Sequence, residues 1–130
     1  MRHSVIVPIV LAFFGATAGA AHAAKLMCAV VDVFDCSGKD CTEVTSESVG
    51  VPDMVRLDTA AKTMKALDAE FGGAESSLES VSDDGKKTTA KATQNDRSLV
   101  FAIDNESGYA VLTVSDSKVT LVAYGECSSL

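Results

Sequence analysis

Four cysteines, at positions 28, 36, 41 and 127, constrain this chain more than any other feature of its sequence. An even number of cysteines in a small exported domain is typical of a disulfide framework. A zinc site built from all four is the alternative, but such sites usually combine two close pairs, and here only Cys36 and Cys41 lie near each other. We therefore expect two disulfides and no metal site.

The N-terminus predicts that the chain is exported. A short basic head over residues 1–3 precedes an uncharged apolar run over residues 5–14, and small residues then lead to Ala21-His22-Ala23. This order is that of a cleavable signal peptide over residues 1–23. Its apolar run is too short to span a bilayer as a helix, so we expect no stable membrane insertion after cleavage. The 107 residues that remain, 24–130, fit a single domain in the periplasm or the medium.

Composition argues against several classes of function. Cleavage removes one of the 11 basic residues and none of the 18 acidic ones, which leaves a net charge of −8. A chain this acidic is repelled by nucleic acid and by anionic membranes, so a charged partner is expected to be basic. Both histidines, His3 and His22, fall in the signal peptide, which excludes histidine-dependent triads and metal sites from the mature protein.

Other chemistry finds little support. Paired cysteines leave no thiolate, and no glycine pattern forms a phosphate loop between a strand and a helix. Calcium could be held by the acidic clusters Asp83-Asp84-Gly85 and Asp104-Asn105-Glu106, but hairpin turns, with Gly85 and Gly108 at positive φ, explain them better. We therefore expect a protein that is not an enzyme and that needs no cofactor.

The reach of the chain selects the disulfide pairing. A valine-rich strand over residues 26–34, a turn over 37–40 and a returning strand over 41–45 would place Cys36 opposite Cys41, within disulfide range. Cys28 and Cys36 would be about 26 Å apart on one strand, against a limit of about 7 Å. With Cys36 opposite Cys41, residue 28 would lie opposite position 49, which argues against a bridge from Cys28 to Cys41. The remaining bridge, Cys28 to Cys127, would tie the first strand to the last.

The second half of the chain alternates β-prone runs with clusters of turn-forming residues. The runs cover residues 77–82, 87–93, 98–103, 109–115 and 119–126. This spacing predicts a mainly β fold, a single small antiparallel meander that closes as a β-barrel or barrel-like sheet. We expect Phe101, Tyr109 and Tyr124 to fill the interior of such a barrel.

Residues 54–71 allow two structures. Apolar side chains recur at helical spacing from Leu57 to Phe71, Asp58 could cap the start of a helix, and Gly72-Gly73 could end it. The alternative is a hairpin of residues 54–57 and 63–67. Local pattern slightly favours the helix.

Several short motifs are spread over most of the mature chain. They are the strand that contains Cys28, the turn from Cys36 to Cys41, the sequence VPDMVRLD at 51–58, and AYGEC at 123–127. Together they resemble a group of small exported proteobacterial proteins of unassigned function. The resemblance implies an all-β fold and favours the hairpin, with room for one short helix near residues 58–71. A looser similarity, of architecture alone, is to periplasmic β-barrel lysozyme inhibitors, whose inhibitory loop motif is absent here.

Three hypotheses of function follow. The first is an exported non-catalytic binding module that docks a basic protein through its acidic loops. The alternative is a lipocalin-like carrier of a small apolar ligand, held in a barrel interior that small side chains such as Ala90, Ala92, Ala102 and Ala110 leave open. The third is a structural component of the cell envelope.

Overall fold

The computed structural model describes residues 25–73 and 75–130, and the predicted signal peptide, residues 1–23, lies outside this part of the chain. The described residues form ten strands and two short helical segments. They are β1 (Lys25–Asp35), β2 (Thr42–Val44), α1 (Ser46–Val49), β3 (Met54–Asp58), β4 (Thr63–Ala66), η1 (Ala69–Phe71), β5 (Glu75–Ser77), β6 (Ser80–Asp83), β7 (Lys87–Gln94), β8 (Arg97–Asp104), β9 (Tyr109–Ser115) and β10 (Thr120–Ser129).

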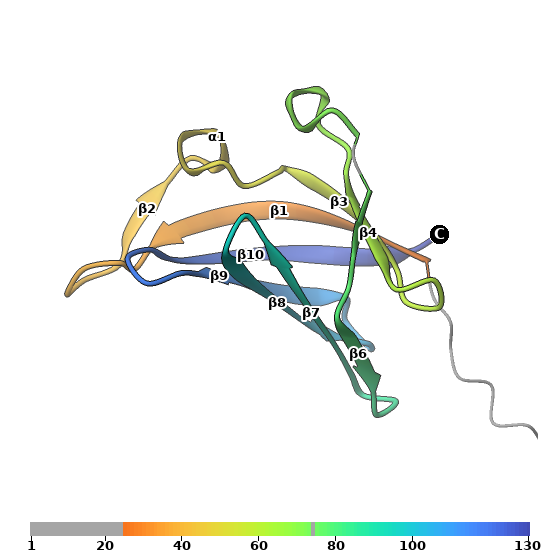
Figure 1. The fold of residues 1–130 in the computed structure, drawn as a ribbon. Helices are drawn as coiled ribbons and strands as arrows, with labels where there is room; N and C mark the ends of the chain where they lie inside the picture. Colours follow the sequence, from red (N-terminus) through yellow and green to blue (C-terminus); the bar gives the residue numbers. More distant parts are fainter. Residues whose placement is uncertain (1–24, 74) are drawn as a thin grey trace, which may run out of the picture.

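One antiparallel sheet contains these strands and curls into a half-barrel (Figure 1). Its order is β5-β4-β3-β1-β10-β9-β8-β7-β6, and β2 pairs with β1 beside this path. The expected mainly β, barrel-like sheet is therefore confirmed. In the described ranges, neither helical segment is long and apolar enough to cross a membrane.

The two edge strands, β5 and β6, follow each other directly in the sequence. The N–H group of Leu78 donates to the carbonyl of Lys62 beside β4 (2.8 Å), and the N–H group of Glu79 donates to the carbonyl of Lys91 on β7 (2.7 Å). The segment from β5 to β6 thus crosses from one edge of the curled sheet to the other.

The core lies on the concave face of the sheet. Alternate residues of each strand point to this face, because side chains in a strand alternate between its two sides. Apart from Cys127, the buried apolar residues on β3, β4 and β7 to β10 are Val55, Leu57, Met64, Ala90, Ala92, Phe101, Ile103, Ala110, Leu112, Val114, Leu121 and Ala123. Two predicted interior residues, Tyr109 and Tyr124, are on the opposite face. Their rings contact each other there, with centroids 6.3 Å apart, and Tyr109 is half exposed, so that expectation was wrong for both.

The first and last strands form the seam of the fold. β1 pairs with β10 from Leu26 opposite Ser129 to Asp35 opposite Leu121, and a bulge lies between Val30 and Asp32. Within this ladder Cys28 is directly opposite Cys127, and the two are joined by a disulfide with Cα atoms 4.0 Å apart.

A second disulfide joins Cys36 to Cys41, at the turn between β1 and β2. The structure therefore contains both bridges that the distance argument predicts. It has no free cysteine among the described residues. Disulfides persist in oxidising compartments, so this pairing indicates that the protein works in one.

The register predicted beyond this turn was wrong. Cys28 lies opposite Val55 of β3, and not opposite position 49, because β2 ends at Val44 and the chain then turns into α1. Thr45 caps α1 by accepting a hydrogen bond from the N–H group of Ser48 (3.2 Å), and Gly50 ends it at φ 69°. This short helical turn occupies the residues that a longer β2 would have used.

Residues 54–66 form the hairpin of β3 and β4, as the resemblance implies, and the helix that local spacing favours is absent. Asp58, a candidate helix cap, instead accepts hydrogen bonds from the N–H groups of Ala60 and Ala61 in the hairpin turn. The hairpin buries Leu57 completely and Met64 nearly so, which the two-residue alternation of a strand achieves equally well. Further along, the predicted short helix is reduced to the single turn η1.

Candidate functional site

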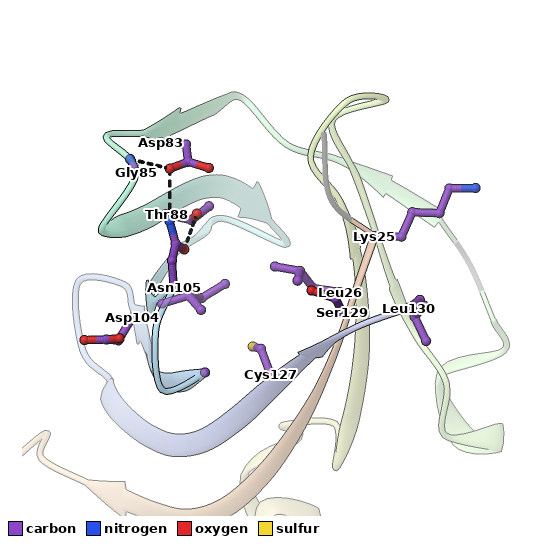
Figure 2. Close-up of a pocket in the computed structure, with 12 residues that line it drawn as sticks. Lys25, Leu26, Asp83, Gly85, Thr88, Asp104, Asn105, Cys127, Ser129 and Leu130 are labelled. Atoms are coloured by element: carbon purple, nitrogen blue, oxygen red, sulfur yellow. Dashed lines mark hydrogen bonds between the residues drawn. The ribbon is translucent and has the colours of Figure 1, made fainter. Parts of the chain in front are cut away.

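The described part of the chain has a polar hollow and an apolar cavity, and each is a candidate binding site. The polar hollow, of about 500 Å³, lies where β1 begins and β10 ends, beside the turns that follow β6 and β8. Its wall includes Asp83, Asp104 and Asn105, which Figure 2 shows gathered on one side, while Lys25 and Leu130 lie on the other.

Hydrogen bonds within the wall use the polar groups of this hollow. The buried hydroxyl of Thr88 donates to Asn105 Oδ1 (2.7 Å), and Asn105 Nδ2 donates to Asp83 Oδ1 (3.0 Å). The same Asp83 oxygen accepts the N–H group of Gly85 (2.8 Å), as the dashed lines in Figure 2 show. Because these groups satisfy one another, their role is to tie the two turns together.

The acidic clusters around this hollow are turns, as the sequence predicts. Gly85 and Gly108 have φ values of 87° and 79°, in the region that side chains disfavour. Across residues 25–73 and 75–130, no group of three or more acidic, histidine or cysteine side chains is arranged to hold a metal ion.

Aspartates cap turns at both ends of the sheet. Each of three carboxylates accepts two backbone N–H groups, which stabilise the charged form and so hold the pKa below its ordinary value of 3.8. The donors are Lys87 and Lys86 for Asp84, Ser107 and Glu106 for Asp104, and Lys118 and Val119 for Asp116.

These pKa shifts predict how acid destabilises the protein. Because the pKa of the folded state is lowered, the contribution of each aspartate is fully present above the unfolded-state pKa and is lost as pH falls through the folded value. We expect the melting temperature to fall below about pH 4. In a variant with Asp84, Asp104 and Asp116 changed to Asn, which can still cap a turn but does not titrate, this fall should be shallower.

Thermal unfolding followed by circular dichroism between pH 2 and 7 measures this effect. A triple variant of exposed strand and helix carboxylates, Glu43→Gln, Glu47→Gln and Glu126→Gln, controls for the change in net charge. If the asparagine variant loses stability in acid as steeply as the glutamine control, the turn aspartates are not the groups responsible.

The second hollow is an apolar cavity of about 430 Å³ against the concave face of the sheet. Sheet residues form most of its apolar lining, and Val51 and Pro52 from the loop before β3, with Phe71 from η1, form a further wall. The sheet residues are Val55 on β3, Met64 and Ala66 on β4, Leu99 and Phe101 on β8, and Leu112 and Val114 on β9. The apolar lining therefore combines residues from four strands, from the loop before β3 and from η1.

Local hydrogen bonds hold the loop wall in place. The N–H group of Val51 donates to the carbonyl of Ser46, the first residue of α1 (2.9 Å), and Val51 is buried. Asp68, just before η1, accepts the N–H groups of Asp53 (2.8 Å) and Met54 (3.0 Å). The wall is thus fixed to the start of β3.

The alanines that the sequence suggests for an open interior have different positions. Ala90, Ala92 and Ala110 are buried on the concave face, but Ala102 belongs to the other face, because it alternates with the buried Phe101 and Ile103. None of these four alanines lines the cavity, so the sequence did not identify its walls. Among alanines of the described chain, Ala66 lines it.

Polar side chains also line this cavity. Ser76, Gln94, Asn95 and Arg97 line the same cavity, so it has one cationic side chain and, among its described lining residues, no carboxylate. Three of them belong to the β7–β8 hairpin, and Gln94 Nε2 donates to Ser76 Oγ on β5 (3.4 Å).

Sequence reasoning assigned no role to this polar group. The signal was present: inward positions on β8 alternate from Ile103 back through Phe101 and Leu99, and the next position in that series is Arg97. Whether Arg97 belongs to this inward series depends on where the turn between β7 and β8 ends. That turn is formed by Asn95 and Asp96, both with positive φ, at 51° and 62°.

Known proteins give no match to this chain. No family model, no curated protein and no solved structure matches it, so the resemblance to small exported proteobacterial proteins stays a prediction.

Proposed function

We propose that this protein is an exported non-catalytic binding module, a carrier that holds a small apolar ligand in the cavity of its curled sheet. The cavity itself carries the proposal. Its volume of about 430 Å³ and its aliphatic and aromatic lining are typical of small-molecule sites, which also place a few polar groups where the ligand must be oriented. The predicted signal peptide and the two disulfides support a periplasmic or extracellular location.

The docking of a basic protein through acidic loops has weaker support. Asp84 and Asp104 lie in turns at one end of the sheet, whereas Asp116 lies in the β9–β10 turn at the other end. Because their oxygens already accept N–H groups of their own turns, these carboxylates do not form one prepared surface. The cavity is the better candidate.

Binding of a neutral fluorescent probe, N-phenyl-naphthylamine, tests this function. We expect the fluorescence of the probe to increase when it binds the wild-type protein, because the probe is weakly fluorescent in water and strongly fluorescent in an apolar site. Filling the cavity by Ala66→Phe should weaken binding at least tenfold, or about 1.4 kcal/mol. Ala102→Phe adds the same side chain to the other face of the sheet and should leave binding unchanged.

Melting temperatures of both variants show whether each is folded, because extra volume in a packed site can itself be destabilising. A saturating ligand should raise the wild-type melting temperature and should not raise that of Ala66→Phe. The carrier function is wrong if the wild-type protein binds no probe, or if folded Ala66→Phe binds it as tightly as Ala102→Phe does.

A further inference from the structure

A single cationic side chain, Arg97, lines an otherwise apolar and neutral cavity. We propose that the ligand is an amphipathic anion, an aliphatic chain with a carboxylate head group, and that Arg97 binds this head group. The inference rests on the carrier function proposed above and specifies the class of ligand.

The fold places Arg97 next to the apolar wall. It is the first residue of β8, two residues before Leu99 and four before Phe101, so the three side chains share one side of the strand. In the hairpin register Arg97 is opposite Gln94, which also lines the cavity. An aliphatic chain lying against Leu99 and Phe101 would therefore have its end beside the guanidinium group.

Arg97 is held in position by one neighbour but is not saturated by it. Asp116 Oδ2 lies 3.4 Å from Arg97 Nε, while Asp116 Oδ1 accepts the N–H groups of Lys118 and Val119, both at 2.7 Å. The guanidinium group carries five N–H donors in a planar fork, and a single contact at Nε leaves the outer donors for a second carboxylate. The Arg97 side chain is 36% exposed, so a head group can reach it from the solvent.

The charges around the cavity favour an anion over a cation. The described lining has Arg97 and no carboxylate, in a chain whose formal net charge is −7. The neutral groups beside Arg97, on Ser76, Gln94 and Asn95, can donate hydrogen bonds to a carboxylate oxygen. A site for a neutral oil would gain nothing from this arrangement, and a site for an amphipathic cation would be expected to present Asp or Glu.

Three ligands with the same tail and different heads test the proposal: dodecanoate, dodecanol and dodecyltrimethylammonium. Isothermal titration at pH 8, below the micelle concentrations, gives their affinities for the full protein. We expect dodecanoate to bind about tenfold more tightly than dodecanol, because a hydrogen bond from Arg97 to a carboxylate is stronger than one to a neutral hydroxyl group. The cation should bind most weakly, because Arg97 repels it. In Arg97→Gln the preference for dodecanoate should vanish while dodecanol binding is unchanged.

Arg56→Gln is the matched control, because Arg56 is exposed on β3 and lies outside the cavity lining. It removes the same charge and should keep the preference for dodecanoate. Equal binding of dodecanoate and dodecanol to the wild-type protein overturns the assignment of an anionic head but leaves the carrier function standing. A preference that survives in Arg97→Gln, or that is lost equally in Arg56→Gln, also overturns the role of Arg97. If none of the three ligands binds, the carrier function and this inference are both wrong.

Discussion

Replacing Cys28 and Cys127 together by alanine is expected to lower the melting temperature far more than replacing Cys36 and Cys41. The two bridges close loops of very different length, with sequence separations of 99 and 5. In the chain-entropy account, these loops correspond to about 4.7 and about 2 kcal/mol of stabilisation. The difference is a large share of the roughly 5–15 kcal/mol that holds a domain together.

Packing acts in the same direction. Cys28 and Cys127 are 5% and 9% exposed and belong to the core, whereas Cys41 is exposed on the surface. Removing the buried sulfurs therefore also removes core contacts, which the other pair does not provide. From the entropy difference alone, we expect the melting temperatures of the two double variants to differ by roughly 10–20 °C.

Differential scanning calorimetry of both double variants, under conditions that keep the remaining bridge oxidised, measures this difference. The variant of all four cysteines serves as a reference, and because it also lacks the short bridge, worth about 2 kcal/mol, it should melt roughly 8–16 °C below the Cys28→Ala, Cys127→Ala protein. If the two double variants melt at the same temperature, or in the reverse order, the pairing of β1 with β10 is not the main restraint on the fold.

The elements that the sequence predicted well are those fixed by local signals. β9 runs from Tyr109 to Ser115 in both the prediction and the structure, because alternating apolar residues lie between two clusters of turn-forming residues that each begin with an aspartate. The disulfides were predictable for a related reason. Strand geometry excludes most pairings by distance alone, so even approximate strand positions were sufficient.

The sequence was ambiguous where local signals agree with two structures, and it failed where an element is too short to show a pattern. Asp58 can cap a helix or a hairpin turn, and Leu57 and Met64 fit the apolar face of either, so only the pairing of β3 with β1 decides between them. α1 was missed because a capped turn of four residues has too few positions to show a period. Its presence then shifted the partner of Cys28 from position 49 to Val55.

The candidate site was the least predictable part of the molecule. A cavity forms where side chains from facing parts of the curled sheet leave the space between them unfilled. The alternation of residues in the sequence indicates only which face of the sheet each side chain occupies. Ala102 illustrates the difficulty, because one step along β8 moves it from the interior to the other face. The position of Arg97 likewise follows from the length of the turn at Asn95 and Asp96. Local composition specified that turn only as a cluster of polar residues.

Replacing Gly125 by alanine should destabilise the fold through the same seam that the long disulfide closes. Gly125 lies on β10 opposite Val30, where the bulge of β1 begins. A Cβ atom at this position would collide with the carbonyl oxygen of Ala29 and would lie 3.2 Å from the Cα atom of Val30. Both obstacles are backbone atoms, so no side chain can move aside. Glycine in a strand often marks such a close approach of another backbone.

The β1 backbone also has little freedom to retreat. On its other side, the N–H group of Val30 donates to the carbonyl of Asp53 at the start of the β3 hairpin (2.8 Å). A shift that relieved the collision would break this bond or displace the bulge. We therefore expect Gly125→Ala to lower the free energy of unfolding by about 1–3 kcal/mol, the usual cost of overpacking, although alanine is otherwise the better residue in a strand.

Urea denaturation of Gly125→Ala beside Gly38→Ala separates the steric effect from the loss of glycine itself. Gly38 lies in the exposed turn between Cys36 and Cys41, and a Cβ atom there would meet nothing within 4 Å. Its substitution should change the free energy of unfolding by less than about 0.5 kcal/mol. Similar values for the two variants would show that β1 and β10 are further apart at the bulge than described. A loss confined to Gly125→Ala would identify the contact of Gly125 with Ala29 as the point where the seam tolerates no added atom.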